Sequence, residues 1–153
     1  MSYTAAILTI SDKGARGERE DKSGPVLCEL AAEHGYQVVY TAIIPDEKDQ
    51  IQAELIKCSD ELHVSLVLTT GGTGFSPRDN APEATLAACE RMAPGIAEAM
   101  RITSLQITPR AMLSRAVSGI RKKTLIVNLP GSPKAVQEAL EYLLPHLEHG
   151  ISV

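Results

Sequence analysis

Short apolar segments alternate with amphipathic segments along the chain, and the two patterns predict different elements. Residues 64–68 are apolar except for Ser65 and show no alternation, which is typical of a strand buried on both faces of a parallel sheet. Four other segments are rich in β-branched and apolar residues and also predict strands: 3–10, 36–44, 116–120 and 124–129.

Between these strands apolar positions recur every three or four residues, which predicts helices. The first helix follows Asp21 or Ser23 as its cap, has Pro25 in its first turn, and ends at Gly35. Further helices are predicted over 51–62, 82–90 and 94–105, and a final one follows residue 133 with an apolar stripe to Leu147. Residues 11–22 carry eight charges and two glycines without a period, so we expect a mobile loop there.

The alternation of strands and helices predicts the α/β class. We expect a three-layer α/β/α arrangement around an open, mostly parallel sheet. The 153 residues suit one domain, so we expect residues 1–153 to fold as a single unit.

Composition narrows the possible functions. The net charge is −4 and aromatic residues make up 3% of the chain, which argues against a nucleic-acid-binding surface of basic and stacking side chains. No apolar run approaches the about 18 residues that cross a membrane, and no signal peptide is evident, so a cytoplasmic protein is expected. Cys28, Cys58 and Cys89 form no CxxC pair, and the four histidines show no metal-binding spacing.

The glycine-rich loop at residues 69–74 (TTGGTG) follows the buried strand and is the sharpest chemical signal. In open α/β sheets ligands bind beyond the carboxyl ends of the strands, and such a loop can cradle phosphate oxygens with its N–H groups and hydroxyls. It is neither a Walker A loop nor a dinucleotide fingerprint, because no Gly-Lys-Ser/Thr closes it and Pro77 occupies the third glycine position. A tight strand-to-helix turn is the alternative interpretation.

Asp46 and Asp79 follow two different strands of the predicted sheet. Each could simply cap a helix. Both would emerge at the same edge of the sheet, however, and two carboxylates beside a phosphate cradle repel phosphates unless a cation intervenes. Mg²⁺ takes one or two carboxylates together with substrate phosphate oxygens, so a magnesium site is the second interpretation.

Four segments together resemble the molybdopterin adenylyltransferase family, which includes the Mog and MoaB types and the G domains of gephyrin. They are residues 69–85 (with the motif TTGGTG-x-x-PRD-x-x-PEAT), 44–47 (IPDE), 112–115 (MLSR) and 128–131 (NLPG), within a resemblance that covers about residues 7–149. The resemblance implies a single molybdopterin-binding domain of that family's fold.

The resemblance also implies an activity in molybdenum cofactor biosynthesis. The terminal phosphate of molybdopterin would attack the α-phosphate of ATP, with Mg²⁺ required and pyrophosphate released. Carried over by motif, Asp46 and Asp79 match the family's essential, metal-binding aspartates. The matching substrate- and nucleotide-binding positions are Ser11, Asp12, Thr70, Gly71, Gly72, Thr73, Gly74, Ser114, Asn128, Pro130, Gly131 and Ser132.

The implied partners are two further copies of the chain, in a homotrimer, and a molybdenum insertase that would take the adenylylated product. The predicted interface is the segment 94–115, through Ile96, Met100, Ile102, Leu105, Met112 and Leu113. Arg78 or the turn Arg121–Lys123 could supply positive charge to the outer phosphates, although for that turn a solvated hairpin tip is favoured.

Two other functions remain open. One is a molybdopterin-binding or scaffold paralogue with little catalytic activity, which the loss of an aspartate would have favoured. The other is a flavodoxin-like electron carrier, which normally flanks its flavin with aromatic rings that this chain almost lacks.

Overall fold

Six strands form one mixed, mostly parallel sheet in the computed structural model, which describes residues 3–153. The order is β2-β1-β3-β6-β5-β4, and β1 pairs parallel with β2 and β3, as does β3 with β6. β5 runs antiparallel to both β6 and β4. The bounds are β1 Thr4–Ile10, β2 Gln37–Ile44, β3 Leu66–Thr70, β4 Arg91–Met92, β5 Ser118–Arg121 and β6 Thr124–Leu129. The expected α/β class is confirmed.

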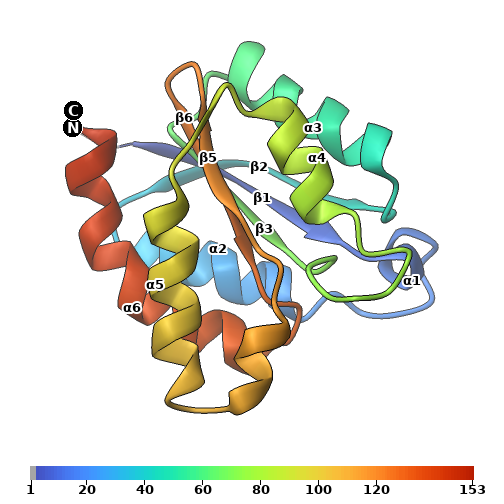
Figure 1. Cartoon of the computed structure of the whole chain (residues 1–153). Coiled ribbons are helices and arrows are strands. Elements are labelled where there is room, and N and C mark those ends of the chain that lie inside the picture. Colours follow the sequence, from blue (N-terminus) through green and yellow to red (C-terminus); the bar gives the residue numbers. More distant parts are fainter. Residues whose placement is uncertain (1–2) are drawn as a thin grey trace.

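Helices cover both faces of this sheet, so the molecule has three layers (Figure 1). On one face lie α2 (Ser23–Glu33), α5 (Pro94–Leu105) and α6 (Pro133–Ile151). On the other lie α3 (Lys48–Asp60) and α4 (Ala81–Ala88). Among residues 3–153 no helix is long and apolar enough to cross a membrane.

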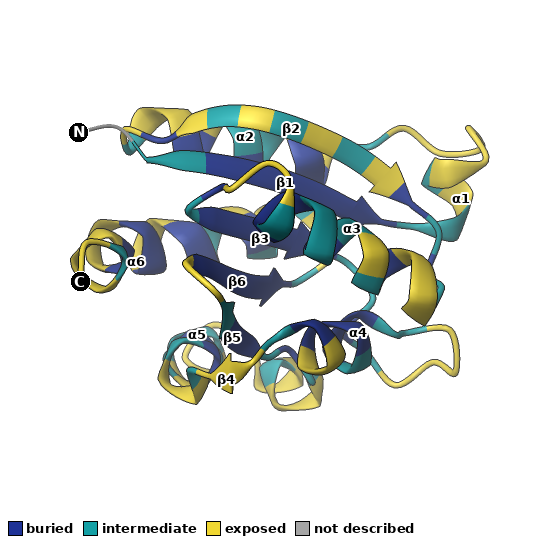
Figure 2. Ribbon diagram, turned by 90° about the horizontal axis from the view of Figure 1, so that it is seen from above, coloured by how far each residue is buried: buried dark blue, intermediate teal, exposed yellow. Residues whose placement is uncertain are grey.

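The two faces of β1 show why both layers form. Ala5 and Ile7 pack under α2 and α6, whereas Ala6 and Leu8 pack under α3 and α4. β3 and β6 are buried along their whole length, while the edge strand β2 is half exposed (Figure 2). The core is aliphatic, and truncating one such buried leucine to alanine typically costs about 2–5 kcal/mol.

The expected mobile loop at residues 11–22 was partly wrong. It contains a short helix, α1 (Asp12–Ala15), whose first turn is capped by the Ser11 hydroxyl accepting from the Gly14 N–H at 2.9 Å. β4 and the 3₁₀ turn η1 (Pro109–Leu113) were also missed. Elements of two to five residues are too short to show a hydrophobic period, which explains all three omissions.

Candidate functional site

The candidate site lies at the carboxyl ends of the parallel strands, where the loops after β1, β2, β3 and β6 meet. The glycine loop after β3 is held beside β6, because the Gly71 N–H donates to the Leu129 carbonyl (3.3 Å) and the Thr70 hydroxyl donates to the Pro130 carbonyl (2.6 Å). The Thr70 hydroxyl proton is therefore engaged within the protein and is not donated to a ligand.

The glycines of this loop are required by their surroundings. Gly71 and Gly72 have φ of 94° and 71°, a region that side chains disfavour. A Cβ at residue 71 would collide with the Ile10 carbonyl oxygen. A Cβ at Gly72 would lie 2.9 Å from Asp46 Oδ2, and one at Gly74 would lie 2.9 Å from Asp79 Oδ2. The carboxylates of both predicted aspartates therefore lie in contact with the glycine loop.

Asp46 is buried and held by backbone groups. Its Oδ1 accepts from the Asn80 N–H (2.8 Å), and its own N–H donates to Asp12 Oδ1 (2.9 Å). Burial raises the pKa of this carboxyl to about 6, and the charge of nearby Asp79 adds to the rise. The N-cap of α3 is Glu47, without a capping side-chain bond, so the interpretation of Asp46 as a helix cap is wrong.

Asp79 also does not cap the helix that follows it. Its Oδ2 accepts from the Ser76 N–H at 2.8 Å within the loop, and the N-cap of α4 is Asn80. In both aspartates a backbone N–H holds one oxygen, and the carboxylate lies against a glycine.

The two carboxylates provide the hard oxygen atoms that Mg²⁺ prefers. Within residues 3–153 no group of three or more acidic, histidine or cysteine side chains could hold a metal ion by itself. Asp46 and Asp79 therefore fit a cation that takes its remaining ligands from a phosphate substrate and water. They do not form a closed structural metal site.

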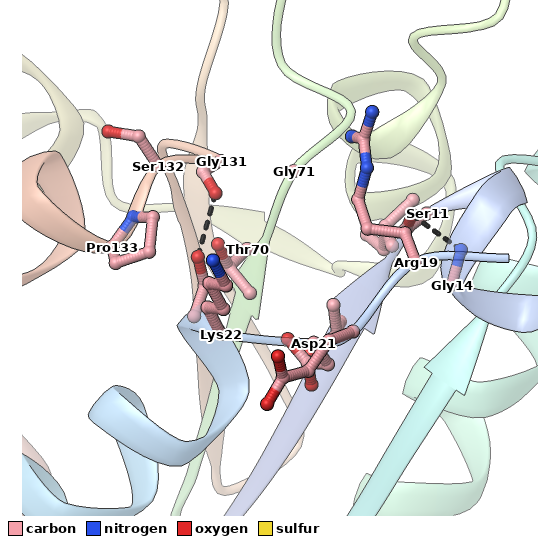
Figure 3. Close-up of a pocket in the computed structure, with 14 residues that line it drawn as sticks. Ser11, Gly14, Arg19, Asp21, Lys22, Thr70, Gly71, Gly131, Ser132 and Pro133 are labelled. Atoms are coloured by element: carbon pink, nitrogen blue, oxygen red, sulfur yellow. Dashed lines mark hydrogen bonds between the residues drawn. The ribbon is translucent and has the colours of Figure 1, made fainter. Parts of the chain in front are cut away.

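A pocket of 720 Å³ opens beside Gly71 (Figure 3). Ser11 and Arg19 lie on one side of Gly71, and Gly131, Ser132 and Pro133 lie on the other. The N-termini of α2 and α6 border this pocket through Ser23 and Pro133, and the helix dipoles place partial positive charge there. Lys22 and Arg19 line the pocket together with Glu20 and Asp21, so its formal charges balance. The helix ends are therefore what favours phosphate groups at this place.

Only some of the residues that line this pocket were predicted from the sequence. Five of the expected binding residues line it, namely Ser11, Thr70, Gly71, Gly131 and Ser132. Arg19 and Lys22 were missed, because nothing in the charged segment 11–22 distinguishes the side chains that turn toward the sheet.

Asn128 lies away from the pocket and is completely buried. Its amide donates to the hydroxyls of Thr69 (3.0 Å) and Thr85 (2.9 Å) and accepts from the Val117 N–H (3.1 Å). These bonds use its polar atoms to join β6 to β3, α4 and the segment before β5. Its position in the structure is that of a core residue.

The remaining expected residues do not line the pocket either. Ser114 follows η1, and its hydroxyl accepts from the Ala116 N–H at 3.2 Å. Seven further expected residues are also outside the lining: Asp12, Asp46, Gly72, Thr73, Gly74, Asp79 and Pro130. Asp12 instead supports Asp46, and Gly72 and Gly74 contact the two aspartates.

The proposed sources of positive charge lie elsewhere. Arg78 donates to both carboxylate oxygens of Asp12 (2.8 and 3.1 Å) and to Glu47 (2.7 Å), so its guanidinium is already neutralised. The turn Arg121–Lys123 precedes β6, at the opposite end of that strand from the pocket. It cannot supply charge to phosphates bound at Gly71.

Arg115 supports the glycine loop and was not among the residues predicted from the sequence. Its backbone N–H donates to the Thr73 carbonyl (2.8 Å), and its guanidinium donates to the carbonyls of Gly74 (2.7 Å) and Asp79 (2.8 Å). An ion pair with Glu83 of α4 (2.6 Å) completes its contacts. Arg115 thus fixes the glycine loop from outside the pocket, and only its place beside Ser114 in the MLSR segment pointed to it.

Comparisons with known proteins found a matching family model and several similar chains. Residues 6–149 match the family model described as a probable molybdopterin binding domain. A molybdopterin adenylyltransferase of Helicobacter pylori is 44% identical over 149 residues, covering 96% of this chain and 85% of that protein. The Escherichia coli K12 protein of the same name is 46% identical over 137 residues, covering 88% and 70%.

A solved structure of a Thermus molybdopterin biosynthesis enzyme, MoaB, superposes with a TM-score of 0.93 at 47% identity. The match covers 98% of this chain and 94% of that one. A MoaB from Pyrococcus furiosus, described as synthesising the tungsten cofactor, gives a TM-score of 0.89 at 31% identity, covering 99% and 96%.

Proposed function

Because the chain belongs to the family of probable molybdopterin binding domains, we propose that it is a molybdopterin adenylyltransferase of molybdenum cofactor biosynthesis. It transfers adenylyl from ATP to the terminal phosphate of molybdopterin and releases pyrophosphate. The observation that carries the proposal is the contact of Asp46 and Asp79 with one glycine loop, next to a pocket suited to phosphates. A flavin carrier is not supported, since the relatives are molybdopterin proteins.

The pocket residues bind and orient the phosphates. The N-termini of α2 and α6 and the side chains of Lys22 and Arg19 offer positive charge to the phosphates, whereas Glu20 and Asp21 of the same pocket bring its formal charge to zero. Such positioning accounts for most of the catalysis in phosphoryl and nucleotidyl transfer. The attacking phosphate is already ionised near neutral pH, so the reaction needs no general base, and no histidine lines this pocket.

Asp46 and Asp79 would hold Mg²⁺. When bound, the ion neutralises negative charge on the reacting phosphate and on the departing pyrophosphate. The chain's own contribution is to orient the two carboxylates. The Asp46 N–H donates to Asp12, and the Asn80 N–H donates to the Asp46 carboxylate. The Ser76 N–H donates to the Asp79 carboxylate.

The same proposal covers assembly and location. We place the chain, as one domain over residues 1–153, in a cytoplasmic homotrimer that delivers its product to a molybdenum insertase. The exposed apolar side chains of Ile102, Leu105, Met112 and Leu113 support an interface on α5 and η1. Met100 is 2% exposed and Ile96 packs against the same core cluster, so both leave the expected interface set. Light scattering should give about three times the 16.4 kDa chain mass.

The direct test is to incubate the purified protein with molybdopterin, ATP and Mg²⁺ and to follow adenylylated pterin and pyrophosphate by mass spectrometry. We expect both products in equal amounts, and neither after addition of EDTA. Pterin binding without product would instead support the scaffold function.

A further inference from the structure

A second cavity, of 690 Å³, lies between α5 and α6. Figure 1 shows these two helices side by side on one face of the sheet. The cavity is bordered by Lys122 and Lys123, which precede β6, whereas Gly131 of the phosphate pocket follows the other end of that strand. The length of a six-residue strand, about 20 Å, therefore separates the two sites. We call this cavity the α5–α6 groove.

The floor of the α5–α6 groove is aliphatic. It is formed by side chains from both helices and from β5 and β6: Ile96, Ile120, Leu125, Leu143, Leu147 and Ile151. Its volume falls in the usual range of small-molecule sites, which are mostly apolar with a few polar groups at defined places. The floor therefore suits an apolar ligand body.

The rim of the groove is basic. Arg91, Lys122, Lys123 and His146 line it, and no aspartate or glutamate does. This reverses the composition of the whole chain, which has 19 acidic and 15 basic residues. Lys122 pairs with Asp60 at 3.2 Å, but Arg91 and Lys123 have no salt bridge within residues 3–153. Two cations at the rim are thus available to an anion.

The wall formed by α5 is fixed to the sheet. The buried Ser118 hydroxyl of β5 donates to the Ala93 carbonyl (2.7 Å) and accepts from the Ala97 N–H (3.1 Å). The nearby Glu90 carboxylate accepts from the Lys122 N–H (2.8 Å), which anchors it to the turn backbone. A groove with a fixed wall is pre-organised, which lowers the cost of binding.

We propose that the α5–α6 groove binds a small amphipathic anion, free in solution, as a site separate from the phosphate pocket. The apolar body lies on the aliphatic floor, and a carboxylate or similar head group contacts Arg91 and Lys123. This site does not depend on the proposed adenylyltransferase activity.

The test uses three probes on isotope-labelled full-length protein, followed by NMR titration. Decanoate carries both features, decyltrimethylammonium has the same chain with the opposite charge, and acetate has the head group alone. We expect decanoate to shift the resonances of Ala99 and Leu147, and the other two to bind at least about tenfold more weakly. Equal binding of the cationic probe, or shifts confined to the Gly131 pocket, would overturn the proposal.

Variants test the contacts separately. Arg91→Gln combined with Lys123→Gln should weaken decanoate binding about five- to thirtyfold, the scale of two exposed charge pairs. Ala99→Phe, or the milder Ala99→Met, should block the groove. Lys48→Gln is the control, because it removes an exposed cation of α3 that lies outside both the groove and the proposed interface. Normal decanoate binding by the charge variant, or by both Ala99 variants, would refute the site. It would also be refuted if the protein sedimented with phosphatidylglycerol vesicles but did not bind free decanoate.

Discussion

Asn80 holds Asp46 at two points. Its backbone N–H donates to Asp46 Oδ1 (2.8 Å), and its side-chain amide donates to the Asp46 carbonyl (3.1 Å). The loop after β2 is thereby tied to the loop before α4, next to Asp79. The separation of the two proposed metal ligands therefore depends on a residue that binds neither metal nor substrate.

Replacement of Asn80 by alanine removes its two side-chain bonds, to the carbonyls of Asp46 (3.1 Å) and Arg78 (3.3 Å), and keeps the backbone bond. We expect the free energy of unfolding to fall by about 1–3 kcal/mol, since one hydrogen bond is usually worth about 0.5–1.5 kcal/mol. We expect kcat for adenylylation to fall about tenfold with KM for molybdopterin unchanged, because positioning is impaired and binding is not. Gln137→Ala is the control, since that amide contacts only the exposed Glu141 in the structure. An unchanged kcat would contradict the positioning role.

Arg78 should act on Asp46 through Asp12. Arg78 is half exposed, so its ion pairs should contribute less than about 1 kcal/mol to stability. The Asp12 Oδ1 atom accepts both from the Asp46 N–H and from the Arg78 guanidinium. In a double-mutant cycle of Arg78→Gln and Asp12→Asn, the two effects on kcat should therefore be strongly non-additive. If Arg78 bound the outer phosphates of ATP instead, Arg78→Gln would raise KM for ATP equally in both backgrounds.

Gly72 cannot be replaced without strain. An alanine methyl there would lie 2.9 Å from Asp46 Oδ2 and 3.2 Å from Ala81 Cβ, at a φ of 71°. We expect Gly72→Ala to lower the free energy of unfolding in urea by about 1–3 kcal/mol. Gly95→Ala, in α5, meets nothing within 4 Å and should stabilise the protein by about 0.5–1 kcal/mol. Similar urea midpoints for Gly72→Ala and Gly95→Ala would show that the glycine loop relaxes around the added methyl group.

The parts of the fold that the sequence predicted well are those with a long, regular pattern. The strand at 124–129 and the helix at 94–105 have the predicted bounds, because continuous burial and a helical period leave little choice. β4, two residues long, depends on its pairing with β5 and has no pattern of its own.

The candidate site divides in the same way. Asp46 and Asp79 could be selected because both were expected at one edge of the sheet and because the family resemblance matched them, whereas each taken alone favoured a helix cap. Asn128 was matched by the same resemblance, yet it lies within β6 and its amide is directed into the core, because Thr69 and Thr85 offer it buried partners. The contacts of Asn80 and Arg115 could not be predicted, since they depend on which loops become neighbours after folding.

Charge removal at Asp46 should have a pH-dependent effect on stability. The pKa of Asp46 rises from the ordinary 3.8 to about 6 in the folded protein, mainly because burial disfavours the charged form. The protonated form therefore stabilises the fold, and this contribution is lost as pH rises from about 4 through about 6. Without Mg²⁺, Asp46→Asn should match the parent below pH ~4 and exceed it by about 1–3 kcal/mol above pH ~7. Urea unfolding across this pH range measures the difference, and a constant offset would contradict it.

The activities of Asp46→Asn and Asp79→Asn separate an enzyme from a scaffold. Asparagine keeps the shape of each side chain and can still accept the bonds from the Asn80 and Ser76 N–H groups, so the loops should keep their structure. It removes the charge that would hold Mg²⁺, and adenylylation should then fall by at least about 100-fold, the scale for losing a pre-organised electrostatic group. Pterin binding should persist in both variants, because the pocket beside Gly71 is unchanged.

Product formation and pterin affinity are measured on the same preparations of Asp46→Asn, Asp79→Asn and the parent. Near-normal turnover in both variants would show that neither carboxylate holds a catalytic cation. Loss of pterin binding together with turnover would mean that the aspartates support the pocket itself and do not act in the transfer step.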